Sequence, residues 1–168
     1  MAALALLRHA RPMLTAQPPP PLPSGAGLRF TVVASRYNGR FVDGLVEGAL
    51  ETLRAAGAGE PELIRVPGSW EIPVVAGAVA RRARGRPDAI LCFGVIWQGE
   101  TLHAQHIGDA VSDALMALAM QTGVPVIHQV LTVSNEEQAT ARCLNPDTHR
   151  GIEGARTALD MARLMADL

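Results

Sequence analysis

The sequence predicts an α/β fold in which helices cover both faces of a four-stranded parallel sheet. Short apolar or β-branched runs recur at about 29–35, 62–66, 89–96 and 125–132. Longer helical patterns separate them at about 40–56, 72–84 and 103–121, and two more follow near 135–143 and 150–166. Strands that alternate with helices form right-handed crossovers, which make the sheet parallel and cover both of its faces. The strand segments are nearly continuous apolar runs, as expected for strands buried on both sides.

Local signals support the individual elements. Apolar residues from Leu45 to Leu53 repeat with a helical period, and Gly57 and Gly59 end that helix. Pro73 suits the first turn of the second helix. The third helix is expected to open at Thr101, after a turn at Gly99. The chain therefore predicts one domain over residues 28–168.

Composition excludes several classes of function. The chain has 168 residues, 48% of them hydrophobic, and a net charge of −1, so nothing in its charge favours a nucleic-acid partner. No apolar run is long enough to span a membrane. The two cysteines, Cys92 and Cys143, favour a reduced, cytoplasmic setting. Neither they nor the five histidines have metal-ligand spacing, so we expect no metal site.

Residues 1–27 differ from the rest of the chain. The first twelve residues are basic and apolar without an acid, and Pro18 to Pro21 and Pro23 then form a proline-rich stretch. We expect a disordered, proline-rich N-terminal tail, which we interpret as a bacterial extension or as the product of an upstream translation start. A transit peptide, which would place the protein in a plastid, is the alternative.

Polar motifs follow the predicted strands at their carboxyl ends. Residues 36–38 follow the first strand, 66–73 the second and 135–142 the fourth. Ligands bind beyond this edge of an open parallel sheet. The strongest motif is 94–103, where a helix opening after Gly99 offers unpaired N–H groups to an anion and His103 can move protons near neutral pH.

These motifs, in this order, closely resemble those of the 6,7-dimethyl-8-ribityllumazine synthase family, which catalyses the penultimate step of riboflavin biosynthesis. The resemblance covers about Leu28 to Leu168. It implies a three-layer, flavodoxin-like sandwich. It also implies the condensation of 5-amino-6-(D-ribitylamino)uracil with 3,4-dihydroxy-2-butanone 4-phosphate, giving the lumazine, phosphate and water without a cofactor.

The resemblance assigns roles to individual residues. Tyr37 would stack on the pyrimidine, Asn38 would hydrogen-bond the heterocycle or polyol, and Glu71 would accept hydrogen bonds from the ribityl hydroxyls. The other residues expected to line the pyrimidine pocket are Ser69, Trp70, Ile72, Val95 and Ile96.

The remaining assignments concern the phosphate and the proton transfer. Gly99, Glu100 and Thr101 would hold the phosphate of the butanone with help from Arg142, and His103 would be the general acid–base. We expect the Glu100 carboxylate to point away, because it would repel the phosphate. Two further positively charged or titratable side chains are expected near the pyrimidine, namely His128 and Arg150, with Glu153 orienting Arg150.

The resemblance also implies a homo-oligomer with active sites between subunits. We expect a pentamer in which the neighbour supplies His128, Arg142 and Arg150, with a decamer or a 60-subunit shell as alternatives. The helix at 103–121 carries apolar residues over much of its surface, which supports a subunit contact. Riboflavin synthase is a further possible partner.

Three single positions and one short segment depart from the family pattern. Gln98 stands where an arginine is typical, Trp97 replaces a small aliphatic residue, His128 replaces a phenylalanine, and 104–106 replaces aromatic and acidic residues. They suggest an alternative, a catalytically altered homologue that binds flavin or forms a shell. A phosphate- or nucleotide-binding module ranks last, because the chain lacks a G-x-G-x-x-G or Walker loop.

Overall fold

Four parallel strands form the central sheet of the computed structural model, which describes residues 20–168. The strands are β1 (Phe30–Ser35), β2 (Glu62–Val66), β3 (Ala89–Trp97) and β4 (Val126–Val133), in the order β2-β1-β3-β4. β1 and β3 lie in the centre and are buried along almost their whole length. The predicted four-stranded parallel sheet is confirmed.

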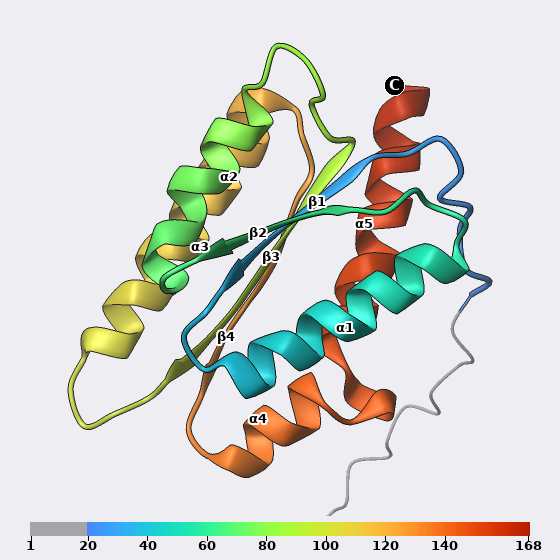
Figure 1. Cartoon of the computed structure of the whole chain (residues 1–168). Helices are drawn as coiled ribbons and strands as arrows, with labels where there is room; N and C mark the ends of the chain where they lie inside the picture. The colour runs from blue at the N-terminus through green and yellow to red at the C-terminus, as the bar shows by residue number, and fades with distance from the viewer. Residues whose placement is uncertain (1–19) are drawn as a thin grey trace, which may run out of the picture.

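Helices cover both faces of this sheet, so the fold has three layers (Figure 1). α1 (Gly39–Ala55), α4 (Glu136–Cys143) and α5 (Arg150–Asp167) lie on one face, and α2 (Ile72–Ala80) and α3 (His103–Thr122) on the other. Each face has its own hydrophobic core. Leu45, Phe93 and Leu159 belong to the first, and Ile72 and Leu115 to the second.

Two helix boundaries differ from the prediction by more than one residue. α2 ends at Ala80, four residues before the predicted end, because the apolar pattern stops there and Arg82 turns back to pair with Glu62 on β2, with Nη1 2.6 Å from Oε2. α3 begins at His103, two residues after the predicted opening at Thr101. The Thr101 hydroxyl instead accepts a hydrogen bond of 3.4 Å from the backbone N–H of His103.

The start of α5 is held tightly against α1. A Cβ on Gly151 would overlap the backbone of Leu45, so only glycine permits this helix contact. Next to it the imidazole of His149 lies over Gly48 of α1, and a Cβ on Gly48 would stand 2.5 Å from the ring. The close packing sets the position of Arg150, the first residue of α5.

The predicted tail over 1–27 falls mainly on residues 1–19, which lie outside the described residues. Residues 20–27 contain no helix or strand and run beside α5. Arg163 of α5 donates hydrogen bonds to the carbonyls of Ser24 and Ala26 at 2.9 and 2.8 Å. Across residues 20–168, none of the helices combines the length and apolar character that a membrane span requires.

Candidate functional site

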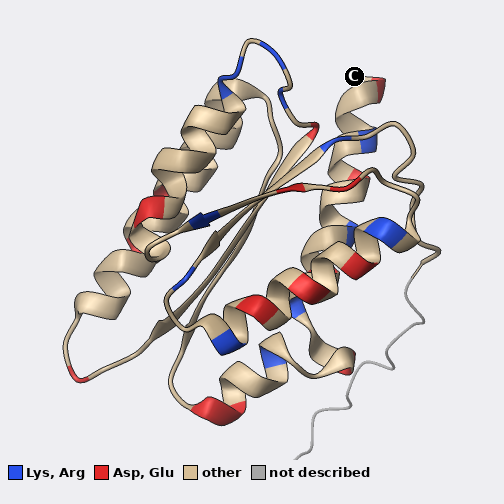
Figure 2. Cartoon of the chain, in the orientation of Figure 1, with Lys and Arg blue, Asp and Glu red and all other residues tan. Residues whose placement is uncertain are grey.

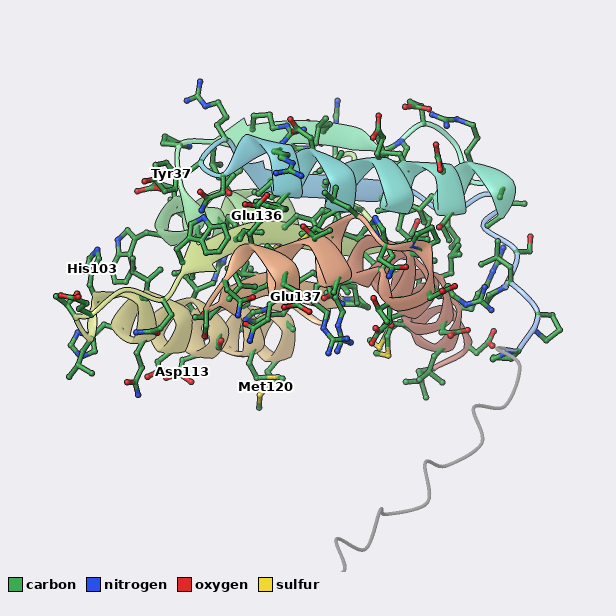
Figure 3. The ribbon with its side chains drawn as sticks, turned by 90° about the horizontal axis from the view of Figure 1, so that it is seen from below. Tyr37, His103, Asp113, Met120, Glu136 and Glu137 are labelled. Atoms are coloured by element: carbon green, nitrogen blue, oxygen red, sulfur yellow. The ribbon has the colours of Figure 1, made fainter. Side chains whose placement is uncertain are left out.

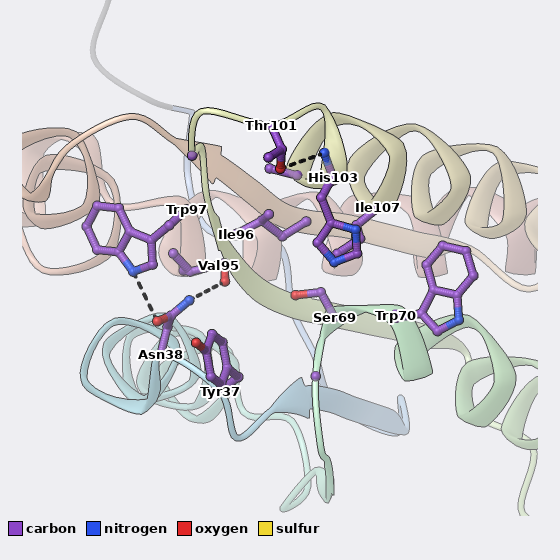
Figure 4. Close-up of a pocket in the computed structure, with 13 residues that line it drawn as sticks. Tyr37, Asn38, Ser69, Trp70, Val95, Ile96, Trp97, Thr101, His103 and Ile107 are labelled. Carbon is purple, nitrogen blue, oxygen red and sulfur yellow. Dashed lines mark hydrogen bonds between the residues drawn. The ribbon is translucent and has the colours of Figure 1, made fainter.

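A cavity of about 480 Å³ opens at the carboxyl edge of the sheet (Figure 4). Loops after β1 and β2, the end of β3 and the start of α3 form its wall. Its lining consists of Tyr37, Asn38, Gly68, Ser69, Trp70, Val95, Ile96, Trp97, Gly99, Thr101, His103, Ala104 and Ile107. Segments that are far apart in the sequence thus meet at one place, where the strand order and the parallel topology predict a ligand site.

Aromatic rings stand on opposite sides of this cavity. Tyr37, after β1, and Trp70, after β2, are 71% and 57% exposed, so their flat faces remain available to a ligand. Tyr37 and Trp97 lie on one side of the end of β3, whereas Trp70 and His103 lie on the other (Figure 4). Such rings bury a planar heterocycle well by stacking.

Asn38 lines the cavity but is also bound within the protein. Its backbone is left-handed, with φ 58° and ψ 40°, a conformation that asparagine tolerates better than most residues. Its side-chain Nδ2 donates to the carbonyl of Val95 at 2.7 Å, and its Oδ1 accepts from Nε1 of Trp97 at 3.0 Å. The Trp97 ring in turn packs edge-on against Phe41, with centroids 5.8 Å apart.

The turn before α2 brings Ser69 to the sheet. Ser69 is buried beside Gly94 of β3, where a Cβ would lie 2.5 Å from the serine Oγ. The carboxylate of Glu71 accepts a hydrogen bond of 2.9 Å from the backbone N–H of Gly68 and does not line the cavity. Ile72 is fully buried in the core behind it. The turn therefore presents Ser69 and Trp70, and Glu71 braces it.

The loop between β3 and α3 has free backbone donors. Gln98 Nε2 donates to the carbonyls of Gly99 and Thr101 at 2.9 and 3.4 Å. Within residues 20–168, the backbone N–H groups of Gly99, Glu100 and Thr101 find no acceptor. Such donors just before a helix favour an anion. Glu100 is exposed and outside the cavity lining, whereas His103 lies beside the loop and within the lining.

Arg142 and Arg150 lie elsewhere. Both line a second depression of about 410 Å³, together with Gln138 and the residues 130–133 of β4. Arg142 is in the last turn of α4, and Arg150 pairs with Glu153 at 2.5 Å, which confirms the predicted contact one helical turn apart. One chain thus carries the predicted cations and the predicted aromatic pocket in two separate depressions.

His128 lines neither depression. It lies on β4, facing α3, where its Nε2 is 2.8 Å from the hydroxyl of Ser112 and its Nδ1 accepts from the backbone N–H of Val130 at 3.2 Å. Ser112 in turn donates to the carbonyl of Gly108, so Nε2 is the protonated nitrogen of a neutral ring. Burial lowers the pKa of His128, which agrees with this neutral tautomer.

Four lining residues were not among the predicted site residues: Gly68, Trp97, Ala104 and Ile107. Ala104 and Ile107 are in α3, and the packing of this helix against the sheet decides that their side chains face the cavity. By sequence, Trp97 stands out only as a departure from the family pattern. Its place as the last residue of β3, at the edge where ligands bind, is the signal that could have identified it.

The cavity offers aromatic side chains to a planar ring and free N–H groups to an anion, and His103 lies in the same lining. Among residues 20–168, no three His, Cys, Asp or Glu side chains lie together as a group that could hold a metal ion. The fold and the site define an α/β protein with a cavity at the carboxyl edge of its sheet, where aromatic side chains, free backbone N–H groups and a histidine meet.

Comparisons with known proteins agree with this class. The family model described as 6,7-dimethyl-8-ribityllumazine synthase matches residues 27–166. A protein of that name from Xanthomonas oryzae pv. oryzae (strain PXO99A) is 43% identical over 139 residues, which are 82% of this chain and 89% of that protein. Its namesake from Xylella fastidiosa (strain 9a5c) is 40% identical over 145 residues, 85% of this chain and 93% of that protein. The chain belongs to the 6,7-dimethyl-8-ribityllumazine synthase family.

Proposed function

We propose that the protein is a transferase that condenses 5-amino-6-(D-ribitylamino)uracil with 3,4-dihydroxy-2-butanone 4-phosphate to give 6,7-dimethyl-8-ribityllumazine. The observation that carries the proposal is the single cavity that unites Tyr37, Trp70, Thr101 and His103 in a chain of this family. The altered homologue considered from the sequence is not favoured, because relatives that span most of the chain carry the name of the synthase.

The chemistry requires two bound substrates and a proton carrier. The 5-amino group attacks the ketone and loses water to give an imine, proton abstraction expels inorganic phosphate, and ring closure with dehydration completes the lumazine. Tyr37 stacks on the pyrimidine, Trp70 lines its pocket, and His103 moves the protons. Holding both substrates together supplies much of the rate, and His103 adds about 10²–10⁴-fold at most.

The phosphate binds at the loop before α3. The free N–H groups of Gly99, Glu100 and Thr101 support this assignment, because unpaired donors just before a helix favour an anion. The Gln98 amide meanwhile donates to two carbonyls of the same loop. Arg142 completes the site from a neighbouring subunit, where its guanidinium can grip phosphate with two parallel hydrogen bonds.

A homo-oligomer with shared sites accounts for the two separate depressions. One subunit presents the cavity, and its neighbour presents the depression lined by Arg142 and Arg150. His128, on β4, comes from the same neighbour. The outer side of α3 supports a subunit contact: Met116 and Met120 are 64% and 79% exposed, and Met120 points outward (Figure 3). α2 and α3 carry few charges compared with α1, α4 and α5 (Figure 2). A pentamer is the proposed ring, with a decamer or a 60-subunit shell as larger forms, and riboflavin synthase as a possible partner.

Activity is tested by mixing the purified protein with both substrates and measuring phosphate release and lumazine absorbance. His103→Ala should lower turnover and leave pyrimidine binding largely intact. His106→Ala is the matched control, since His106 is also exposed near the start of α3 but outside the cavity lining. No lumazine from the wild type would reject the proposed function, and normal turnover by His103→Ala would reject the role of His103.

Site sharing is tested by subunit exchange. His103→Ala subunits and Arg142→Ala subunits are each expected to be inactive or weak, and mixed rings should regain activity because some sites receive both native residues. Sedimentation velocity gives the oligomer size. No recovery, despite proven exchange between labelled subunits, would mean that the site is not shared in this way.

A further inference from the structure

Trp97 is bound in a way that the other tryptophan of the cavity is not. Both tryptophans of the chain line the cavity. The indole N–H of Trp97 donates to Asn38, whereas the indole N–H of Trp70 has no acceptor among residues 20–168. The ring of Trp97 is also packed edge-on against Phe41. The Trp97 ring is therefore held in place as one wall of the cavity, whereas the Trp70 ring is 57% exposed.

The two partners of the Asn38 amide admit only one orientation. The Val95 carbonyl is an acceptor only and must face Nδ2, and the indole N–H is a donor only and must face Oδ1. A flipped amide would place oxygen against oxygen and N–H against N–H. One N–H and one lone pair of the amide remain unused by these bonds, on a residue that lines the cavity.

Asn38 also departs from the ordinary use of its place in the fold. It is the N-cap residue of α1, a position where an asparagine side chain normally accepts a hydrogen bond from the helix. Here the Asn38 side chain makes no cap hydrogen bond and its backbone is left-handed. The helix therefore loses the stabilisation of a side-chain cap, and the amide bonds to Val95 and Trp97 instead. Local strain of this kind is typical of residues that serve a binding site.

We propose that Trp97 is a positioning residue for the pyrimidine substrate: it fixes the Asn38 amide so that its remaining donor and acceptor are presented to the heterocycle or its ribityl chain. The inference rests on the proposed placement of the pyrimidine in this cavity. Trp97 acts through Asn38, and its loss should affect recognition of one substrate more than the chemical step.

Trp97→Phe is the direct test, because phenylalanine keeps an aromatic wall and removes the N–H. The KM for the pyrimidine should rise about two- to tenfold, the range expected for one neutral hydrogen bond. The KM for the butanone phosphate and kcat should change by a smaller factor. An equal rise in both KM values would indicate a general distortion and overturn the proposal.

A double-mutant cycle isolates the path through Asn38. The second background is Asn38→Gly, because glycine adopts the left-handed conformation without strain and removes the amide. In that background Trp97→Phe should have little further effect on the pyrimidine KM. Trp70→Phe is the matched control, since the same chemical change lacks the Asn38 contact and should act equally in both backgrounds. If Trp97→Phe also acts equally in both, Trp97 does not work through Asn38.

A third variant separates this proposal from the one on which it rests. Tyr37→Ala removes a stacking ring from the same cavity and should raise the pyrimidine KM. If it does, and the Trp97–Asn38 cycle shows no coupling, only the positioning role is overturned. If Tyr37→Ala leaves the pyrimidine KM unchanged, the placement of the pyrimidine in the cavity is wrong, and the positioning role fails with it.

Discussion

The imidazole of His149 acts as the N-cap of α5, and its removal should destabilise the fold. Its Nδ1 accepts hydrogen bonds from the backbone N–H groups of Gly151 and Ile152, at 3.1 and 3.4 Å. The ring also lies over Gly48 of α1, where even a methyl group would not fit. His149 therefore both caps one helix and fills the contact with another.

His149→Ala should lower the free energy of unfolding by about 1–2 kcal/mol at pH 8, the upper part of the range for loss of a cap, because the ring contact with α1 is lost as well. For a domain of this size the melting temperature should fall by roughly 3–8 °C. His149→Asn should restore much of the loss, since asparagine is a good N-cap. Melting is followed by circular dichroism at one protein concentration, because an oligomer melts at a temperature that depends on concentration.

The same contact predicts a dependence on pH. Burial lowers the pKa of His149, and this effect outweighs the opposing influence of the Cys143 carbonyl and the Glu51 carboxylate. A lowered pKa in the folded state means that the stabilisation is fully present above the unfolded pKa of about 6.5 and is lost as the pH falls through the folded pKa. Protonation removes the Nδ1 acceptor and places a positive charge at the positive end of α5.

The stability difference between the wild type and His149→Asn isolates this term, because the other titrating groups are common to both. The wild type should lose stability relative to His149→Asn between about pH 7 and pH 5. A difference that stays constant over this range would refute the pH argument. A melting temperature of His149→Ala equal to that of the wild type at pH 8 would refute the capping role itself.

Three further outcomes follow from the site. Gly94→Ala should lower the free energy of unfolding by about 1–3 kcal/mol, because the new Cβ would stand 2.5 Å from Ser69 Oγ. Gly59→Ala, with open space around it, is the control, and equal melting temperatures of the two variants would contradict the packing argument. Gln98→Ala should raise the KM for the butanone phosphate more than the KM for the pyrimidine, because the carbonyls of Gly99 and Thr101, in the loop proposed to bind phosphate, would lose their hydrogen-bond donor. Steady-state kinetics checks this, and a change confined to the pyrimidine KM would count against it. His128 should titrate below the ordinary histidine pKa in an NMR titration, and a value above it would contradict the neutral tautomer.

Local sequence signals were sufficient for the order and type of the elements. Strands such as 89–97 are continuous apolar runs, as expected for strands buried between two layers of helices. Together with the alternation of strands and helices, this pattern predicts a parallel sheet covered on both faces. The strand-end position of Tyr37, Ser69 and His103 follows from the same pattern, because parallel strands end at one edge. Boundaries were less certain: Arg81 to Arg84 are good helix formers, yet α2 ends at Ala80 where its apolar side ends.

Only the tertiary structure decided how the side chains at that edge are used. Asn38 and Trp97 are both compatible with solvent or ligand by sequence, yet the fold commits Asn38 to Val95 and to Trp97. These hydrogen bonds join residues from β3 and from the start of α1, across 57 and 59 positions of sequence for the Asn38 pair. No local pattern encodes the distance between such groups.

The separation of Arg142 and Arg150 from the cavity has the same origin. Motif order places both arginines after the strand that neighbours β3, and only the family resemblance, not residue identity, predicts that they act in the site of a neighbouring subunit. The packing of α4 and α5 against α1, on the face opposite α2 and α3, puts them in a different depression. Sequence determines which chemical groups are available at an edge, whereas the distances between them depend on how the layers pack, because packing is a sum of contacts between residues that are remote in the chain.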